Sequence, residues 1–109
     1  MEVGIDIVKI ERFKSKTKLA QRILSEEELL LYEEAHNKEQ FVSGRFAAKE
    51  AFIKARGSEK TRIPFKRIKI IRGEQGKPSL HYENKVYPVS IAHDGEYAVA
   101  VVIVKKENY

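Results

Sequence analysis

Hydrophobic and polar residues alternate at the start of the chain, in the segment VGIDIV. The apolar residues Val3, Ile5 and Ile7 fall on one side of this segment, and Asp6 falls on the other. A period of two is typical of a β-strand, whose successive side chains point to opposite faces of the sheet. We therefore expect a short strand here. Because Asp is disfavoured inside strands, Asp6 should lie at a strand end, pair with a base or bind a metal.

The segment after the first strand is rich in lysine and arginine, and we expect it to be helical as far as about Leu24. Ser25 and Glu28 then form a capping-box pattern, in which each side chain bonds the backbone of the other residue. This pattern precedes the letters EEELLLYEEA and predicts a short acidic helix there.

Another helix start is indicated by Asn37 and Gln40, which repeat the same spacing. The apolar residues that follow predict a helix of about 19 residues that ends at Arg56. Gly57 suits the left-handed conformation that commonly ends a helix. This helix is the longest element that the sequence predicts.

The periodicity changes after Pro64, where four segments read as strands: FKRIKIIR, PSLHYE, VYPVSIAH and EYAVAVVIVK. The turn GEQGK joins the first two strands, and Asp94 with Gly95 forms a tight-hairpin signal between the last two. The last strand is apolar at nearly every position, so it should be central and covered on both faces. We predict an α+β fold, with an antiparallel sheet packed against one long helix plus shorter helices, in a single domain over residues 1–109.

A narrow polar strip runs along the long helix when its residues are placed 100° apart. Ser43, Glu50 and Lys54 form this strip between two apolar margins. The apolar margins of the strip are Val42, Phe46 and Ile53 on one side and Ala47 on the other. The opposite side of the helix carries the core stripe Phe41, Ala48, Phe52 and Ala55. A separate basic cluster consists of Arg45, Lys49 and Arg56. The strip should therefore be partly covered, by the sheet or by another subunit. A carboxylate there needs a compensating cation, which is either Lys54 or a metal.

Composition narrows the classes of function. The chain has no cysteine, which excludes disulfides, zinc–thiolate sites and thiol nucleophiles. No apolar run approaches the length of about 20 residues that a membrane span needs, and charges begin too early for a signal peptide. We expect a cytoplasmic protein with no membrane association. The net charge of +5 and two basic stretches, from Lys9 to Arg22 and from Lys60 to Arg72, suit RNA, an acidic protein or a phosphorylated small molecule.

Asp6 and Glu50 are carboxylates on separate predicted elements, each with lysines or arginines near it in sequence. Magnesium commonly takes one or two carboxylates and completes its shell with water and phosphate oxygens. Nearby cations, with His93 at the end of a predicted strand, would neutralise the remaining phosphate charge. Spacing alone leaves open whether Asp6 meets Glu50.

The motifs GIDIVKIERF, RILSEEEL, GRFAAKEAFIKA, GKPSL and VSIAHDGEYAVAVVIV occur in this order along the chain. Their order resembles that in the small bacterial holo-acyl-carrier-protein synthases, a family of phosphopantetheinyl transferases. The resemblance covers almost the whole chain. It implies the phosphopantetheinyl transferase fold and a magnesium-dependent transfer of 4′-phosphopantetheine from coenzyme A to a serine of apo-acyl carrier protein. The other product would be adenosine 3′,5′-bisphosphate, and the reaction would support fatty acid biosynthesis.

The resemblance also implies roles for individual residues. Asp6 and Glu50 resemble the magnesium ligands of the family, and Lys54 resembles the residue that contacts the phosphates of coenzyme A. Glu50 and Lys54 would thus be the catalytic residues. Arg45, Lys49 and His93 resemble further residues of the coenzyme A site. The serine proton would pass to Glu50 or to a metal-bound water.

The same family assembles as a homotrimer with its sites between subunits, and its basic helix receives an acidic helix of the carrier protein. Arg12, Phe13 and Arg22 resemble that docking surface. Ala92 departs from the family, in which Ser or Thr often precedes the histidine, so a possible hydroxyl contact is lost. The alternatives are a small RNA-binding module that uses FKRIKIIR, and a catalytically inactive relative that serves as an interaction subunit. If the chain belongs to the phosphopantetheinyl transferases, no nucleic acid partner is expected.

Overall fold

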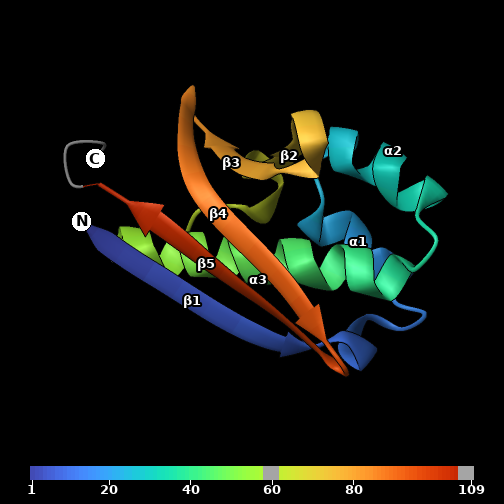
Figure 1. The fold of residues 1–109 in the computed structure, drawn as a ribbon. Coiled ribbons are helices and arrows are strands. Elements are labelled where there is room, and N and C mark those ends of the chain that lie inside the picture. Colours follow the sequence, from blue (N-terminus) through green and yellow to red (C-terminus); the bar gives the residue numbers. More distant parts are fainter. Residues whose placement is uncertain (58–61, 106–109) are drawn as a thin grey trace.

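The computed structural model describes residues 1–57 and 62–105, and Figure 1 shows their arrangement. In chain order the elements are β1 (Glu2–Lys9), the 3₁₀ helix η1 (Ile10–Phe13), α1 (Thr17–Ile23), α2 (Glu26–Glu34), α3 (Lys38–Arg56), the 3₁₀ helix η2 (Phe65–Arg67), β2 (Lys69–Arg72), the 3₁₀ helix η3 (Glu74–Gly76), β3 (Pro78–Tyr82), β4 (Lys85–Asp94) and β5 (Tyr97–Val104). Lys60, at the head of the second basic stretch, lies outside the described residues.

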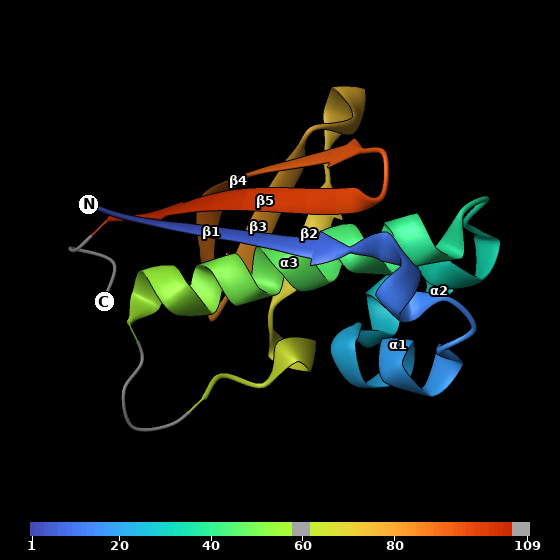
Figure 2. The same cartoon turned by 90° about the horizontal axis from the view of Figure 1, so that it is seen from below.

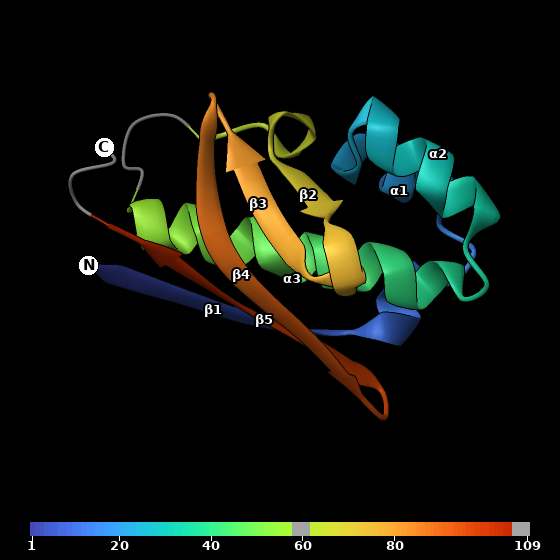
Figure 3. The same cartoon turned by 45° about the horizontal axis from the view of Figure 1, so that its top comes forward.

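The five strands form an antiparallel sheet in the order β1-β5-β4-β3-β2. The first strand pairs with the last, from Glu2 opposite Val104 to Lys9 opposite Tyr97. β4 spans both halves of the sheet, because its first half pairs with β3 and its second half with β5. Figures 1 and 3 show α3 crossing one face of the sheet, with α1 and α2 beside the N-terminal half of α3. The predicted α+β class is confirmed.

α3 begins and ends where its capping residues predict. The side chain of Asn37 accepts a hydrogen bond of 3.0 Å from the backbone N–H of Gln40. Gly57 has the left-handed φ of 62°, and its N–H bonds the carbonyl oxygens of Ile53 and Lys54. The helix runs over 19 residues, so its predicted length is confirmed.

β1 packs unusually close to α3 because Gly4 has no side chain. A Cβ placed at Gly4 would lie 1.9 Å from the carbonyl oxygen of Ala51. Along β1, Gly4 and Val8 are buried and Asp6 is half-buried, so these three residues face the helix. The alternation that predicted the strand therefore places Asp6 against α3.

The polar strip of α3 is covered to different degrees along its length. Ser43 is fully buried, the Glu50 side chain is 20% exposed, and the Lys54 side chain is 56% exposed. The predicted covering is thus confirmed for Ser43 and Glu50, and Lys54 lies at the open end. Both margins of the strip are apolar and buried at Ala47 and Ile53.

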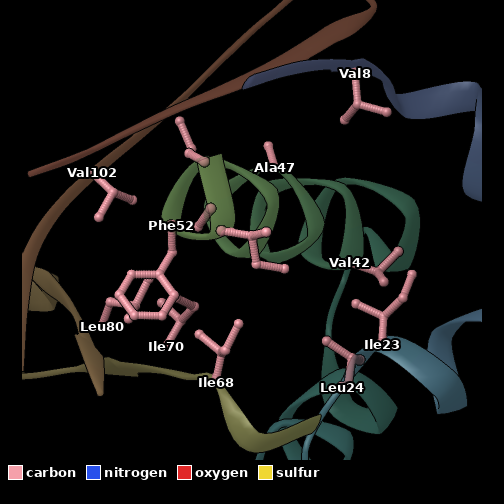
Figure 4. Packing of buried hydrophobic residues seen from close by; sticks show 14 of the residues in the cluster. Val8, Ile23, Leu24, Val42, Ala47, Phe52, Ile68, Ile70, Leu80 and Val102 are labelled. Carbon is pink, nitrogen blue, oxygen red and sulfur yellow. The ribbon is translucent and has the colours of Figure 1, made fainter. Parts of the chain in front are cut away.

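The space between α3 and the sheet is filled by one cluster of apolar side chains (Figure 4). The ring of Phe52 lies 4.9 Å from that of Tyr87 and 5.5 Å from that of Tyr82, measured between centroids. Ile23 and Leu24 extend the cluster to the end of α1 (Figure 4). Each such large side chain contributes about 1.5–3 kcal/mol when it is fully buried.

The basic segment folds as two short helices, η1 and α1. Ser15 between them has a φ of 58°, which a right-handed helix cannot contain. The capping box before α2 is confirmed: Ser25 Oγ accepts from the N–H of Glu28 at 3.2 Å, and Glu28 Oε1 accepts from the N–H of Ser25 at 2.9 Å.

β2 is shorter than the sequence predicts. The expected strand over FKRIKIIR begins only at Lys69, because residues Phe65–Arg67 form η2. The N–H of Arg67 bonds the carbonyl oxygen of Pro64, and the N–H of Ile68 bonds that of Phe65. These local bonds use backbone groups that an extended strand would offer to β3.

The outer face of the sheet is apolar and only partly covered within one chain. Val3, Ile5 and Ile7 of β1 are 61%, 59% and 62% exposed. On β5 the residues that face α3 are buried, whereas Val99 and Val101 on the outer face are half-buried. The prediction that β5 is central is confirmed, and the prediction that it is covered on both faces is wrong for a single chain.

None of the helices in residues 1–57 and 62–105 combines the length and the apolar character needed to cross a bilayer.

Candidate active site

Asp6 is held against α3 by an ion pair with Lys54. The Lys54 ammonium donates to Asp6 Oδ1 at 2.9 Å and to the carbonyl oxygen of Ile5 at 3.2 Å. The Asp6 side chain is 14% exposed, so its carboxylate lies at the rim of the β1–α3 contact. This pair connects two of the predicted site residues across 48 positions of sequence.

Glu50 lies one helical turn before Lys54, and its partner is an arginine that the sequence did not indicate. Arg62 Nη2 donates to Glu50 Oε2 at 2.6 Å. The Arg62 guanidinium also lies 5.3 Å from the centroid of the Phe65 ring. The cation that Glu50 requires is therefore supplied by Arg62 in this structure. Arg62 escaped the sequence analysis because its contact depends on how the chain returns past α3.

The two carboxylates have the donor chemistry of a magnesium site. Asp6 and Glu50 come from adjacent elements, and each already holds one cation. A divalent ion with water and phosphate oxygens in its remaining positions suits two such carboxylates. No group of three or more His, Cys, Asp or Glu suited to a metal occurs in the described part of the chain, so a metal here would take most of its ligands from water or substrate.

A cavity of about 260 Å³ opens between the N-terminal half of α3 and the ends of β2 and β4. Arg45, Arg72 and His93 are among the residues that line it. Gly44 makes room for the histidine, because a Cβ there would lie 3.0 Å from His93 Nε2. His93 Nε2 donates to the carbonyl oxygen of Gln40 at 3.2 Å. The cavity is therefore lined by groups that suit an anion.

The pKa of His93 lies below its ordinary value. Burial is the main cause, and the nearby charge of Arg72 adds to it, while the hydrogen bond to Gln40 acts in the opposite direction. His93 is therefore a neutral imidazole at neutral pH. It offers a hydrogen bond to a ligand rather than a fixed charge.

Arg45 is a buried cation with unused donors. Its guanidinium carbon lies 3.9 Å from the centroid of Phe41, and its Nε lies 3.6 Å from Glu28 Oε2. Nε and Nη2 are buried without a hydrogen-bond partner. Burial lowers the pKa of Arg45, with Glu28 opposing that shift, but arginine stays charged in proteins. Such donors beside a cavity are suited to a phosphate.

Lys49 does not line this cavity. Its ammonium is fully buried and donates to Glu28 Oε1 at 2.6 Å, to the carbonyl oxygen of Ile23 at 2.8 Å and to that of Phe65 at 3.1 Å. Burial lowers the pKa of Lys49, and Glu28 opposes the shift. The structure thus separates Lys49 from Arg45 and His93, with which the family resemblance grouped it.

The three residues predicted to dock a partner are also separated. Arg12 and Arg22 are exposed on η1 and α1. Phe13 is only 2% exposed, and its ring lies 5.3 Å from that of Phe46. Phe13 therefore supports the basic surface from beneath and does not present itself to a partner. Its apolar character, rather than its place in the motif, explains this burial.

Ala92 does not share the cavity with its neighbour His93. Along β4, Tyr87 and His93 face α3, and the alternation of a strand turns Ala92 to the outer face of the sheet. A hydroxyl at this position would not enter the cavity of the same chain.

The geometry has close parallels among known proteins. The model of the 4′-phosphopantetheinyl transferase superfamily matches residues 2–102. The holo-[acyl-carrier-protein] synthase of Staphylococcus saprophyticus is 39% identical over 112 residues, which cover 94% of this chain and 96% of that protein. A holo-(acyl-carrier-protein) synthase from Bacillus anthracis, solved in complex with CoA (3′,5′-ADP), superposes with a TM-score of 0.83 at 37% identity, covering 93% of this chain and 92% of that one. For holo-[acyl-carrier-protein] synthase from Neisseria meningitidis the TM-score is 0.86 at 30% identity, with coverage of 96% and 98%.

The chain therefore belongs to the 4′-phosphopantetheinyl transferase superfamily, a class of enzymes. Within this class its similarity, over nearly its full length, is to the holo-[acyl-carrier-protein] synthases. The family resemblance, the fold and the classification as a transferase are thus confirmed.

Proposed function

We propose that this protein transfers the 4′-phosphopantetheine group of coenzyme A to a serine hydroxyl of an apo-acyl carrier protein and releases adenosine 3′,5′-bisphosphate. The observation that supports this proposal most directly is the ion pair that joins Asp6 of β1 to Lys54 of α3, one helical turn from Glu50, with a cavity lined by arginines along the same helix. Family membership supplies the class of reaction.

We propose that Asp6 and Glu50 hold Mg²⁺. When bound, the ion supplies positive charge to the pyrophosphate of coenzyme A and polarises the phosphorus that is attacked. Lys54, which keeps Asp6 in place, adds a second positive charge for the oxygens on which charge develops. Arg62 leaves Glu50 or shares its carboxylate when the metal is present.

The proposed chemistry is an in-line displacement at phosphorus. The serine oxygen bonds to the phosphorus that carries the pantetheine. The bond from that phosphorus to the bridging oxygen of the pyrophosphate breaks, and its electron pair leaves with adenosine 3′,5′-bisphosphate. Glu50 is the candidate acceptor of the serine proton, because it is a half-buried carboxylate of α3 and a proposed ligand of the metal beside which the serine reacts.

We propose that the cavity beside Arg45 and His93 takes a phosphate of coenzyme A. Glu28 is the single carboxylate beside two buried cations, Arg45 and Lys49, so this cluster keeps a net positive charge. Arg45 and Arg72 both line the cavity, so their positive charges would attract the phosphate oxygens. With Nε2 donating to Gln40, the neutral ring of His93 would have only the acceptor Nδ1 left, so the charge that holds the phosphate would come from the arginines.

The carrier protein is proposed to dock on η1 and α1, where Arg12 and Arg22 are exposed. An acidic helix is the partner that a basic surface of this kind suits. The Arg12 guanidinium lies 5.1 Å from the ring centroid of Phe46, which faces the same region of α3 as Glu50. Docking there would bring the serine toward the proposed metal site.

We propose that the protein is a homotrimer with its sites between subunits. Val3, Ile5 and Ile7 lie on one face of β1 and are each about 60% exposed, and a second copy would cover them. Light scattering tests this proposal: the mass should be three times 12.6 kDa. Ile5→Lys should give monomers, and an unchanged mass would show that this face is not the interface.

A cytoplasmic location and a role in fatty acid biosynthesis follow from the same proposal. Depletion of the protein from its cell should lead to accumulation of apo-carrier and a loss of fatty acid synthesis. Cell fractionation would test the location directly. No nucleic acid partner is expected, and salt-sensitive RNA binding that needs neither magnesium nor coenzyme A would favour the RNA-binding alternative instead.

The decisive experiment is mass spectrometry of an apo-acyl carrier protein after incubation with this protein, coenzyme A and Mg²⁺. The carrier should gain the mass of one phosphopantetheine, and chelation of the metal should prevent the gain. Glu50→Gln and Asp6→Asn should abolish turnover and keep the fold, whereas Glu34→Gln, an exposed carboxylate on α2, is the matched control. Near-normal rates in either variant at saturating Mg²⁺ would exclude the metal assignment. No gain with several carriers would overturn the proposed function.

A further inference from the structure

Lys49 joins three segments that are distant in sequence. Its ammonium bonds the carbonyl oxygen of Ile23 at the end of α1, the carboxylate of Glu28 in the first turn of α2, and the carbonyl oxygen of Phe65 at the start of η2. Figures 2 and 3 show α1 and η2 side by side next to α3. An ammonium has three N–H donors, and here each has an acceptor, so none is left for a ligand.

Glu28 completes this junction from the other side. Besides accepting from Lys49, its carboxylate accepts from the backbone N–H of Ser25 at 2.9 Å and from that of Ile70 in β2 at 2.8 Å. Glu28 is 2% exposed. A residue that the sequence indicates only as a helix cap therefore connects α2, α3 and β2.

The junction lies next to the proposed metal ligand on the same helix. Residues 49 and 50 are neighbours on α3, so a rigid backbone fixes the angle of about 100° between their side chains. Lys49 points to the segments that carry the basic docking residues, and Glu50 points to Arg62. The Lys49 ammonium therefore adds a polar attachment of α1 to α3, beside the apolar packing of Ile23 and Leu24.

We propose that Lys49 is a positioning residue for the carrier protein and not a ligand of coenzyme A. This inference rests on the proposed function, because it concerns how the serine reaches Glu50. The buried ammonium holds α1 against η2, and the carrier that docks on α1 is thereby aligned with the reacting phosphorus. A misplacement of the serine by about 1 Å from the reacting phosphorus would lower the rate of transfer by about 10²-fold.

Two variants test the proposal. Lys49→Met removes the three bonds and leaves Glu28 with Arg45 as its one remaining cation. Lys49→Met combined with Glu28→Gln also removes the carboxylate, so that Arg45 is the single charge left in the cluster, and it keeps an acceptor for the N–H of Ile70. Glu28→Gln alone is measured beside the double variant, because that change by itself takes the carboxylate from Arg45. Lys105→Met is the control, since it removes the same charge from an exposed position after β5.

Initial rates are measured with the carrier concentration varied at saturating coenzyme A. They are then measured with the coenzyme A concentration varied at saturating carrier. The dissociation constant of coenzyme A is measured by calorimetry. In the double variant kcat should fall and the KM for carrier should rise, so that kcat/KM for carrier falls by about tenfold or more, while coenzyme A affinity changes by less than about twofold. Hydrogen exchange at the amides of α1 should accelerate, and the control should match the parent protein in all three measurements.

The outcomes separate the possible failures. If coenzyme A affinity falls as much as the KM for carrier rises, Lys49 belongs to the coenzyme A site and the proposal is wrong. It is equally wrong if the folded double variant keeps both kinetic constants and the exchange rates of α1. If the parent protein modifies no carrier at all, the proposed function fails instead, and exchange at α1 still decides whether Lys49 holds that helix.

Discussion

Gly4→Ala is the sharpest test of how β1 is placed against α3. The added Cβ would lie 1.9 Å from the carbonyl oxygen of Ala51 and 3.0 Å from the N of Ala55. Real Cβ contacts are essentially never shorter than 3.0 Å, so the strand and the helix must separate by more than 1 Å. Both partners are backbone, and neither relaxes by a change of rotamer.

Two effects of opposite sign determine the result. Alanine favours a strand interior over glycine by about 0.5–1 kcal/mol. Overpacking of a rigid contact costs about 1–3 kcal/mol and occasionally more. Because the overlap is so large, we expect Gly4→Ala to lose about 2 kcal/mol in the free energy of unfolding, which lowers Tm by roughly 10 °C.

The assay is urea unfolding followed by far-ultraviolet circular dichroism, at a fixed protein concentration because the proposed assembly would contribute to stability. Gly73→Ala is the matched control, since its nearest neighbour would lie 3.8 Å away. Activity should fall further than stability alone explains, because the displaced strand carries Asp6 away from Lys54. A Gly4→Ala protein as stable as its parent would refute this account of the contact.

Three further predictions concern buried polar groups. Tyr87→Phe should leave the free energy of unfolding unchanged or raise it by up to about 1 kcal/mol, because the Tyr87 hydroxyl is buried without a partner; urea unfolding measures it. Glu28→Ala should cost about 3–5 kcal/mol by the same measurement, since it leaves Lys49 and Arg45 buried without their carboxylate. The pKa of His93 is lowered in the folded protein, so the unfolded chain binds more protons at this residue as the pH falls. The contribution of His93 to the free energy of unfolding is therefore present above the unfolded pKa and is lost as the pH falls through the folded pKa. NMR titration of His93, and the pH dependence of unfolding in His93→Gln, measure this effect.

Each of these three has a result that would contradict it. A clear loss of stability in Tyr87→Phe would mean that the hydroxyl has a bonding partner. A Glu28→Ala protein as stable as an exposed control, Glu33→Ala, would mean that the buried cations do not need the carboxylate. An NMR pKa for His93 at or above that of the exposed His36 would show that the cavity does not disfavour the imidazolium.

Local signals in the sequence predicted most of the secondary structure. Asn37 and Gly57 mark the ends of α3 because a cap acts through the backbone within one turn. The alternation in β1 placed Asp6 on the helix-facing side. The start of β2 was wrong because η2 depends on bonds that the pattern of apolar residues does not encode.

The site was predicted less completely, because its contacts join distant segments. Motif position grouped Lys49 with Arg45, which lies four residues earlier, yet only the positions of α1 and η2 show that the ammonium points away from the cavity. Arg62 pairs with Glu50 across 12 positions of sequence, a separation at which helix geometry predicts no contact. A covered polar strip could be predicted from helix angles, whereas the identity of each partner could not.

Two of the three acceptors of Lys49 are carbonyl oxygens of the main chain, at residues 23 and 65. Every amino acid supplies such an oxygen, so the attachment of α1 places no demand on the side chains of its exposed face. Substitutions on that face, which is proposed to bind the carrier, would therefore leave the spacing between α1 and Glu50 as it is. If residues 14–22 of this chain are replaced by those of a relative, the preference among carrier proteins should change, whereas the residues around Glu50 need no change.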